Sequence, residues 1–276
     1  MTDRHRASAS AGRRVFRITL ALLAGLAVAG HVGWLAFTHT GAAPRPEAAS
    51  TTTRQRSDAA AAEWIRANLP TGIHLLADAV DPPAGYQPVS LAAAGKNWTN
   101  YSYLVTATNT APPADSALAT VWKSSVAVAM FDDIQVRYVL ALTPPDQIQR
   151  DRDADDAERL RAGAALQNNP QLTSSPTAKA ILATGGLDLR AAAVLTALVG
   201  QVPVVLNNIA VVAAEAAAKM PARSITIYSS DPATVTQALS SLAAAFAPDQ
   251  VTVGENGAIE LHWPISVTPM RSVPAS

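Results

Sequence analysis

EWIRANLPTGIHLLAD, residues 63–78, joins a helix-like run directly to a strand-like run. The apolar residues of the helix fall close to one face: Ala61, Trp64, Ile65 and Leu69. Ser57 or Asp58 can cap its N-terminus, Pro70 ends it, and the apolar run at 73–79 follows as a strand. A helix that leads directly into a buried strand is typical of an α/β fold.

The same alternation continues along the first half of the chain. Residues 101–107 form a second strand pattern. Asp132 and Asp133 lie between two apolar runs and suit a tight hairpin at the edge of a sheet. The proline-rich TPPDQ at 143–147 interrupts the pattern, so we place a lobe boundary near residue 150.

The second half repeats the mixture of helices and strands. Acids in DADDAERLRAGAALQNNP, residues 153–170, fit the positive end of a helix. Ser175 and Asp188 can cap two further helices, and Asn256–Gly257 gives the strongest hairpin signal in the chain. Because strands separated by helices favour parallel pairing, the sequence predicts two small α/β lobes. These lobes, residues 58–150 and 151–276, are expected to have mostly parallel sheets with antiparallel edge hairpins.

The composition excludes several functional classes. Hydrophobic residues make up 49% of the 276 residues and charged residues 15%, so the chain can bury a core. The absence of cysteine excludes disulfides, zinc sites built on cysteine and thiol nucleophiles. Five of the 21 basic residues and one of the 21 acidic residues lie in the first 17 positions, so the remainder carries a net charge of −4. A mildly acidic body argues against a nucleic-acid partner.

Residues 15–37, VFRITLALLAGLAVAGHVGWLAF, are predicted to be a transmembrane anchor. The run from Ile18 to Phe37 is long enough for a helix to cross about 30 Å of hydrocarbon. Arginines precede it, so residues 1–14 are expected in the cytoplasm and the chain after Phe37 outside. The predicted location is therefore a single-pass protein of the cell membrane with an extracytoplasmic body.

Two alternatives concern the same N-terminal region. AVAG at 27–30 offers a cleavage pattern for a signal peptide, and RRVFR at 13–17 resembles part of a twin-arginine signal. Either alternative also exports the body. Residues 38–57 are rich in Thr, Ser, Ala and Pro without an apolar period, so we expect a flexible linker before a body that begins near Asp58.

Five segments carry a resemblance to a known protein class. They are WIRANLP, IHLLAD, NYSYLVTAT, VWKSSVAVAMFDDIQVRYV and AERLRAGAALQNNP, between residues 64 and 170. In this order they resemble the soluble extracytoplasmic tail of actinobacterial membrane glycosyltransferases of the dolichyl-phosphate-mannose mannosyltransferase-like class. That class keeps its catalytic acids in a large membrane core, which this chain lacks. The resemblance therefore implies an envelope location and an α/β tail, but no glycosyl transfer and no catalytic residue.

The candidate ligand-binding residues are Trp98, Tyr101 and Tyr103 in NWTNYSY. Aromatic rings beside amides and hydroxyls can stack on a sugar and hydrogen-bond it, although aromatic residues in strands are more often part of the core. DRDADDAE at 151–158 resembles the start of a calcium loop but lacks the glycine and the final glutamate. Acids at a helix N-terminus are the simpler interpretation, so no metal site is predicted.

No catalytic or cofactor motif is recognisable in the sequence. Beyond the linker the histidines are His74 and His262, both within strand-like runs, and no nucleophile elbow is present. The first hypothesis is a non-enzymatic envelope protein that binds a protein or glycan partner, with an accessory role in envelope glycan assembly. The second is an exported hydrolase of envelope glycan or lipid, for which His74 or His262 would lie in a cleft beside a serine or an aspartate.

Overall fold

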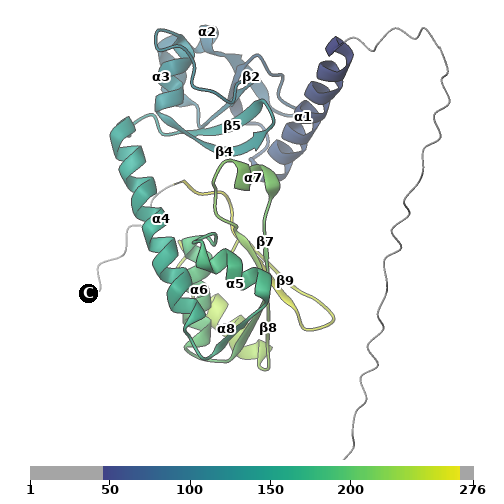
Figure 1. Ribbon diagram of the computed structural model, residues 1–276, viewed down its shortest axis with the longest axis vertical. Helices are drawn as coiled ribbons and strands as arrows, with labels where there is room; N and C mark the ends of the chain where they lie inside the picture. Colours follow the sequence, from purple (N-terminus) through teal and green to yellow (C-terminus); the bar gives the residue numbers. More distant parts are fainter. Residues whose placement is uncertain (1–45, 268–276) are drawn as a thin grey trace, which may run out of the picture. The chain divides into compact units, whose positions relative to one another are not determined.

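The computed structural model describes residues 46–267, and their side chains from Thr53 onward. Two five-stranded sheets and eight α-helices make up these residues (Figure 1). The α/β class expected from the sequence is confirmed.

The first sheet has the strand order β2-β1-β3-β5-β4. Its strands are β1 (His74–Asp78), β2 (Gln87–Ser90), β3 (Tyr103–Thr106), β4 (Ser125–Phe131) and β5 (Ile134–Val139). β1 pairs in parallel with β2 and β3, whereas β5 pairs antiparallel with β3 and β4. The hairpin between β4 and β5 turns at Asp132 and Asp133, as predicted, and Asp132 has a φ of +50°.

Helices cover both faces of the first sheet. They are α1 (Pro46–Asn68), α2 (Leu91–Ala94), the 3₁₀-helix η1 (Gly95–Asn100) and α3 (Ala117–Lys123). On one face Leu75 and Val105 pack with Trp64 and Ile65 of α1, which confirms the apolar stripe read from the sequence. Neighbouring residues of each strand point to opposite faces, so Leu104 belongs to a second core on the other side.

The second sheet has the strand order β6-β7-β8-β10-β9. Its strands are β6 (Leu172–Ser174), β7 (Val204–Ala210), β8 (Ser224–Ser229), β9 (Gln250–Val253) and β10 (Ile259–His262). The accompanying helices are α4 (Pro145–Gln167), α5 (Pro176–Ala183), α6 (Leu189–Val199), α7 (Ala213–Ala217) and α8 (Pro232–Ser240). Ser175 and Asp188 cap α5 and α6, and β9 and β10 form the hairpin predicted at Asn256–Gly257.

The prediction of mostly parallel sheets is wrong for the second sheet and only half right for the first. The second sheet has one parallel pairing, between β6 and β7, and three antiparallel ones. The link between β7 and β8 explains part of this. For β8 to pair in parallel with β7, the connecting helix α7 would have to carry the chain back along the whole length of β7. The five residues of α7 advance about 8 Å, whereas the seven residues of β7 span about 23 Å, so α7 is too short and the pairing is antiparallel.

Helix α1 begins earlier than expected. It starts at Pro46, a residue type that is favourable in a first helical turn, so residues 46–57 of the predicted linker are helical. Ser57 does not cap this helix, because it lies inside it and its buried hydroxyl donates to Asp132 Oδ2 at 2.6 Å. Arg54 pairs with Asp133 at 2.7 Å, so these residues attach to the first sheet.

The predicted lobe boundary near residue 150 falls inside α4. The prolines of TPPDQ begin this helix, because Pro145 lies in its first turn, where no backbone donor is needed. The acids at 151–158 therefore lie inside the helix, after its first turn, and the one acid in the first turn is Asp146. The interpretation of DRDADDAE as a helix-starting acidic cluster is wrong.

The N-terminal predictions concern residues outside the described part of the chain. They are the cytoplasmic segment 1–14, the anchor or signal at 15–37 and the beginning of the linker at 38–45. Between residues 46 and 267, no helix combines the length and the apolar character that a membrane crossing requires.

Candidate functional site

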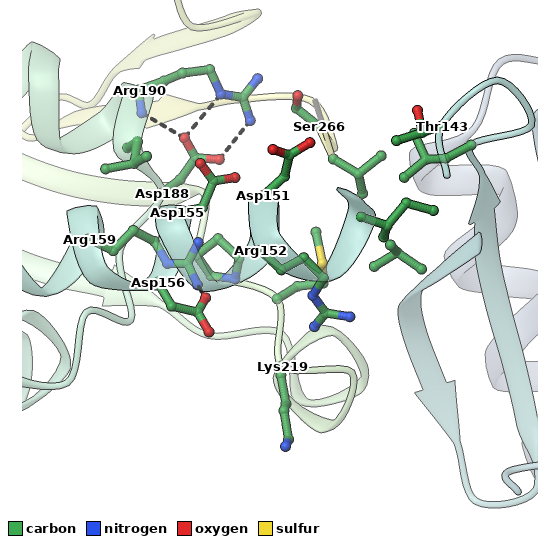
Figure 2. A pocket seen from close by; sticks show the side chains of 17 residues that line it. Thr143, Asp151, Arg152, Asp155, Asp156, Arg159, Asp188, Arg190, Lys219 and Ser266 are labelled. Carbon is green, nitrogen blue, oxygen red and sulfur yellow. Dashed lines mark hydrogen bonds and ion pairs between the residues drawn. The ribbon is translucent and has the colours of Figure 1, made fainter. Parts of the chain in front are cut away.

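A pocket of about 90 Å³, partly open to solvent, lies beside the first half of α4 (Figure 2). Its other walls come from the N-terminal end of α6, the segment after α7, the chain after β10 and the ends of β4 and β5. Val126, Met220 and Val267 contribute apolar surface, while α4 and α6 contribute charged side chains. The pocket thus combines parts of both sheet-containing halves of the chain.

Carboxylates gather on one side of this pocket. Asp151 and Asp155 lie one helical turn apart on α4 and point toward Asp188 and the hydroxyl of Ser266 (Figure 2). Gln147 donates to Asp151 at 2.5 Å, but among the described residues Asp155 has no hydrogen-bond partner. Burial and, to a smaller extent, the neighbouring carboxylates raise the pKa of Asp155 against the opposing effect of Arg159. Asp155 is therefore an incompletely compensated anion.

Asp188 is already neutralised within the protein. Arg190 donates to its carboxylate from Nε at 3.0 Å and from Nη2 at 2.7 Å, and the Arg190 backbone N–H donates at 2.8 Å. Both side chains are about nine-tenths buried, and Nη2 also donates to the carbonyl oxygen of Pro264. This pair fixes the pocket wall, because removal of either charge would leave the other buried without a partner.

Cationic groups lie on the other side of the pocket. Arg152 and Lys219 extend away from the carboxylate group (Figure 2). Within residues 53–267 neither side chain has a hydrogen bond or an ion pair. Arg159 differs from them, because it donates to Gly185 O and pairs with Asp156. Two carboxylates and two cations that have no ion pair among the described residues therefore border one pocket.

The arrangement does not form a metal site. Asp151 and Asp155 share one face of a continuous helix, whereas Asp156 points away from them (Figure 2), so the three cannot fold around an ion as a calcium loop does. Across the described ranges, no group of three or more histidine and carboxylate side chains is placed to hold a metal ion.

A histidine does lie beside a serine elsewhere in the structure. His262 Nδ1 is 2.6 Å from Ser224 Oγ, and both line a second pocket over β7, β8, β9 and β10. The third group, however, is Arg223, whose Nη1 lies 2.7 Å from His262 Nε2. Because a guanidinium only donates, Nε2 accepts and the proton resides on Nδ1, from which it is donated to Ser224. This polarity is opposite to that of a base which activates a serine.

The other predicted residues do not form one site. Trp98 and Tyr101 pack against the core that contains Leu104, whereas Tyr103 packs on the opposite face of the first sheet. There its ring meets that of Tyr138 edge-on at 5.2 Å between centroids. The three aromatic residues thus divide between two cores, and none is fully exposed. His74 is exposed on β1 and, among the described residues, has no hydrogen-bond partner.

The sequence contained part of the signal for the charged pocket. The spacing of Asp151 and Asp155 places both on one helical face, whereas the alternating acids of DRDADDAE also match the ligand spacing of a calcium loop. No pattern in the sequence marks Lys219 or Ser266 as part of this pocket, because only the fold brings them to α4. Comparison with models of protein families, with curated proteins and with solved structures finds no match.

Proposed function

We propose that this chain is a non-enzymatic binding protein of the cell envelope, and that it binds a small zwitterionic molecule in the pocket beside α4. The observation that carries the proposal is the separation of uncompensated charges, with Asp151 and Asp155 on one side and Arg152 and Lys219 on the other. The envelope location rests on the N-terminal pattern and on the resemblance to an extracytoplasmic tail. That resemblance also supports an accessory role in envelope glycan assembly, with an envelope protein or glycan as a further partner.

Charge compensation explains the preferred ligand. A partly buried carboxylate without a hydrogen-bond donor is unfavourable, and a ligand ammonium between Asp151 and Asp155 would supply the donors. Arg152 can take a ligand carboxylate in the planar, two-bond geometry that guanidinium groups favour. A ligand with a single charge would leave one side of the pocket uncompensated. Amino acids and short peptides have both groups.

The alternative, an exported hydrolase, has less support. Its best candidate pair is Ser224 and His262, and the donation from Arg223 gives the histidine the wrong tautomer for a general base. The tautomer that a general base needs has its proton on Nε2, which would place an N–H of His262 against an N–H of Arg223. We therefore favour binding without catalysis.

Isothermal titration calorimetry of the full chain tests the pocket. The probe is the dipeptide Ala-Ala, compared with N-acetyl-Ala-Ala, which lacks the ammonium, and with Ala-Ala amide, which lacks the carboxylate. Asp155→Asn and Arg152→Gln should each weaken binding of Ala-Ala by roughly tenfold or more, since a charge-assisted hydrogen bond contributes about 1.5–3 kcal/mol. Asp153→Asn is the matched control, because Asp153 lies on the same helix but outside the pocket.

The capped dipeptides separate the possible outcomes. Binding of Ala-Ala that exceeds that of both capped forms would support the proposal. Equal binding of all three, or equal effects of Asp155→Asn and Asp153→Asn, would contradict it. Absence of binding by Ala-Ala and by a panel of free amino acids would reject this ligand class.

A further inference from the structure

Arg223, which immediately precedes β8, uses all of its side-chain donors. The guanidinium has five N–H groups. Nε and Nη2 donate to the two carboxylate oxygens of Glu215, at 3.0 and 2.8 Å. The other contacts are Nη1 to Trp263 O and to His262 Nε2, both at 2.7 Å, and Nη2 to Asn68 Oδ1. Since Arg223 is 6% exposed, water cannot replace a lost acceptor easily.

The same network connects distant parts of the chain. Trp64 and Asn68 lie near the end of α1, which packs on the first sheet, whereas Glu215 lies on α7. Trp64 Nε1 donates to Glu215 at 3.0 Å, and Asn68 accepts from Arg223. In Figure 1 α7 lies next to β4 and the end of α1. The network is therefore a polar attachment between α1 and the second sheet.

This attachment requires a neutral His262. Its Nε2 is an acceptor for Arg223, and a proton there would turn the acceptor into a donor that faces another donor. It would also place a second positive charge 2.7 Å from the guanidinium. Both effects remove a contact from Arg223, which is held in place by the sum of its five hydrogen bonds.

We propose that His262 is an acid-sensitive latch, whose protonation releases Arg223 and loosens the attachment of α1 to α7 and β8. The proposal stands on the geometry of this network and does not depend on ligand binding in the pocket beside α4.

The surrounding charges give the direction of the pH dependence. Burial and then the cation Arg223 lower the pKa of His262, Asp249 and Glu215 oppose them to a smaller extent, and Arg190 adds the smallest lowering effect. The closed form therefore binds the proton more weakly than an open form, in which the pKa is about 6.5. Closure is fully favoured above that pH and is lost as the pH falls through it. Between pH 7.5 and 5.0 the opening equilibrium can rise by up to about 30-fold.

Hydrogen exchange with mass spectrometry on the full chain measures this opening. Exchange is compared at pH 7.5 and 5.0 after correction for the intrinsic rates, in peptides that contain residues 60–69 and 211–223. We expect the protection of both segments to fall several-fold or more at pH 5.0. His262→Gln, which keeps a neutral acceptor, should abolish most of this change, whereas His74→Gln should preserve it because His74 is exposed on β1.

A direct titration keeps the proposal testable if His262→Gln does not fold. Exchange at the Cε1–H of His262 in the wild-type chain reports the pKa of this ring. A midpoint clearly below 6.5 together with loss of protection at acid pH supports the latch. A midpoint at or above 6.5, pH-independent protection of both segments, or an unchanged pH dependence in His262→Gln would overturn it.

Discussion

Gly163→Ala is expected to destabilise the protein, although alanine is the better helix former. Gly163 is buried on α4 where this helix crosses α5. A Cβ at this position would overlap the carbonyl oxygen of Leu182 and lie 3.0 Å from its carbonyl carbon. The obstacle is backbone, so no side-chain rotation relieves it, and α4 and α5 have to separate.

The two opposing contributions set the magnitude. Alanine gains about 1 kcal/mol in helix propensity over glycine. Overpacking costs typically about 1–3 kcal/mol, and a clash with backbone belongs at or above the upper end. We expect a net loss of about 2 kcal/mol, which corresponds to about 4–8 °C in Tm for a domain of this size. Urea unfolding followed by circular dichroism measures it.

Gly200→Ala provides the matched control. Gly200 caps α6 with a φ of −73°, and its added Cβ would meet only ordinary contacts, the nearest at 3.4 Å from Ala197 O. Its stability should stay within about 0.5 kcal/mol of the wild type. A Gly163→Ala variant as stable as Gly200→Ala would refute the close approach of α4 and α5, and with it the placement of α4 along the pocket.

Three further outcomes are expected. Asp155→Asn should raise Tm at pH 7 but not at pH 3, because the raised pKa of Asp155 means that its ionised carboxylate destabilises the folded state. Thermal melts at both pH values measure this, and an equal change in Tm at both would contradict it. A chain that begins at Asp58 should be about 1 kcal/mol less stable in urea than one that begins at Pro46, since it lacks the contacts of Arg54 and Ser57 with the β4–β5 turn, and equal stability would make those contacts unimportant. A reporter fused after Ser276 should be active only outside the cytoplasm, and cytoplasmic activity would reject the predicted topology.

Local signals in the sequence predicted local structure well. Ser175, Asp188 and Asn256–Gly257 act within a few residues of their position, and the structure places the expected caps and hairpin there. The start of α4 was missed because prolines begin a helix as readily as they end one. Most of α4 is also exposed, with Ile148, Gly163 and Leu166 as its buried residues, so it has little of the apolar period that marks a helix.

The charged pocket and the latch could not be predicted in the same way. Asp155 comes to share a pocket with Lys219 and Ser266 only through folding, and His262 meets Ser224 across 38 positions and Arg223 across 39. The sequence offered a histidine and many serines, which allowed a hydrolase. The tautomer of His262 argues against that function. This tautomer is set by Arg223, and no spacing rule in the sequence connects Arg223 to His262 and Ser224.

The pocket and the latch share a segment of backbone. Arg190, in the pocket wall, donates to Pro264 O, and Arg223, in the latch, donates to Trp263 O, so two buried arginines hold consecutive carbonyl groups. His262 directly precedes them. Release of Arg223 at acid pH should therefore loosen the pocket wall and lower the affinity for a zwitterion. Protonation of Asp155 would also lower that affinity. In His262→Gln the effect of Asp155 should remain, whereas the effect of Arg223 release should be absent. A pH dependence of binding that is identical in this variant and the wild type would show that the two sites are uncoupled.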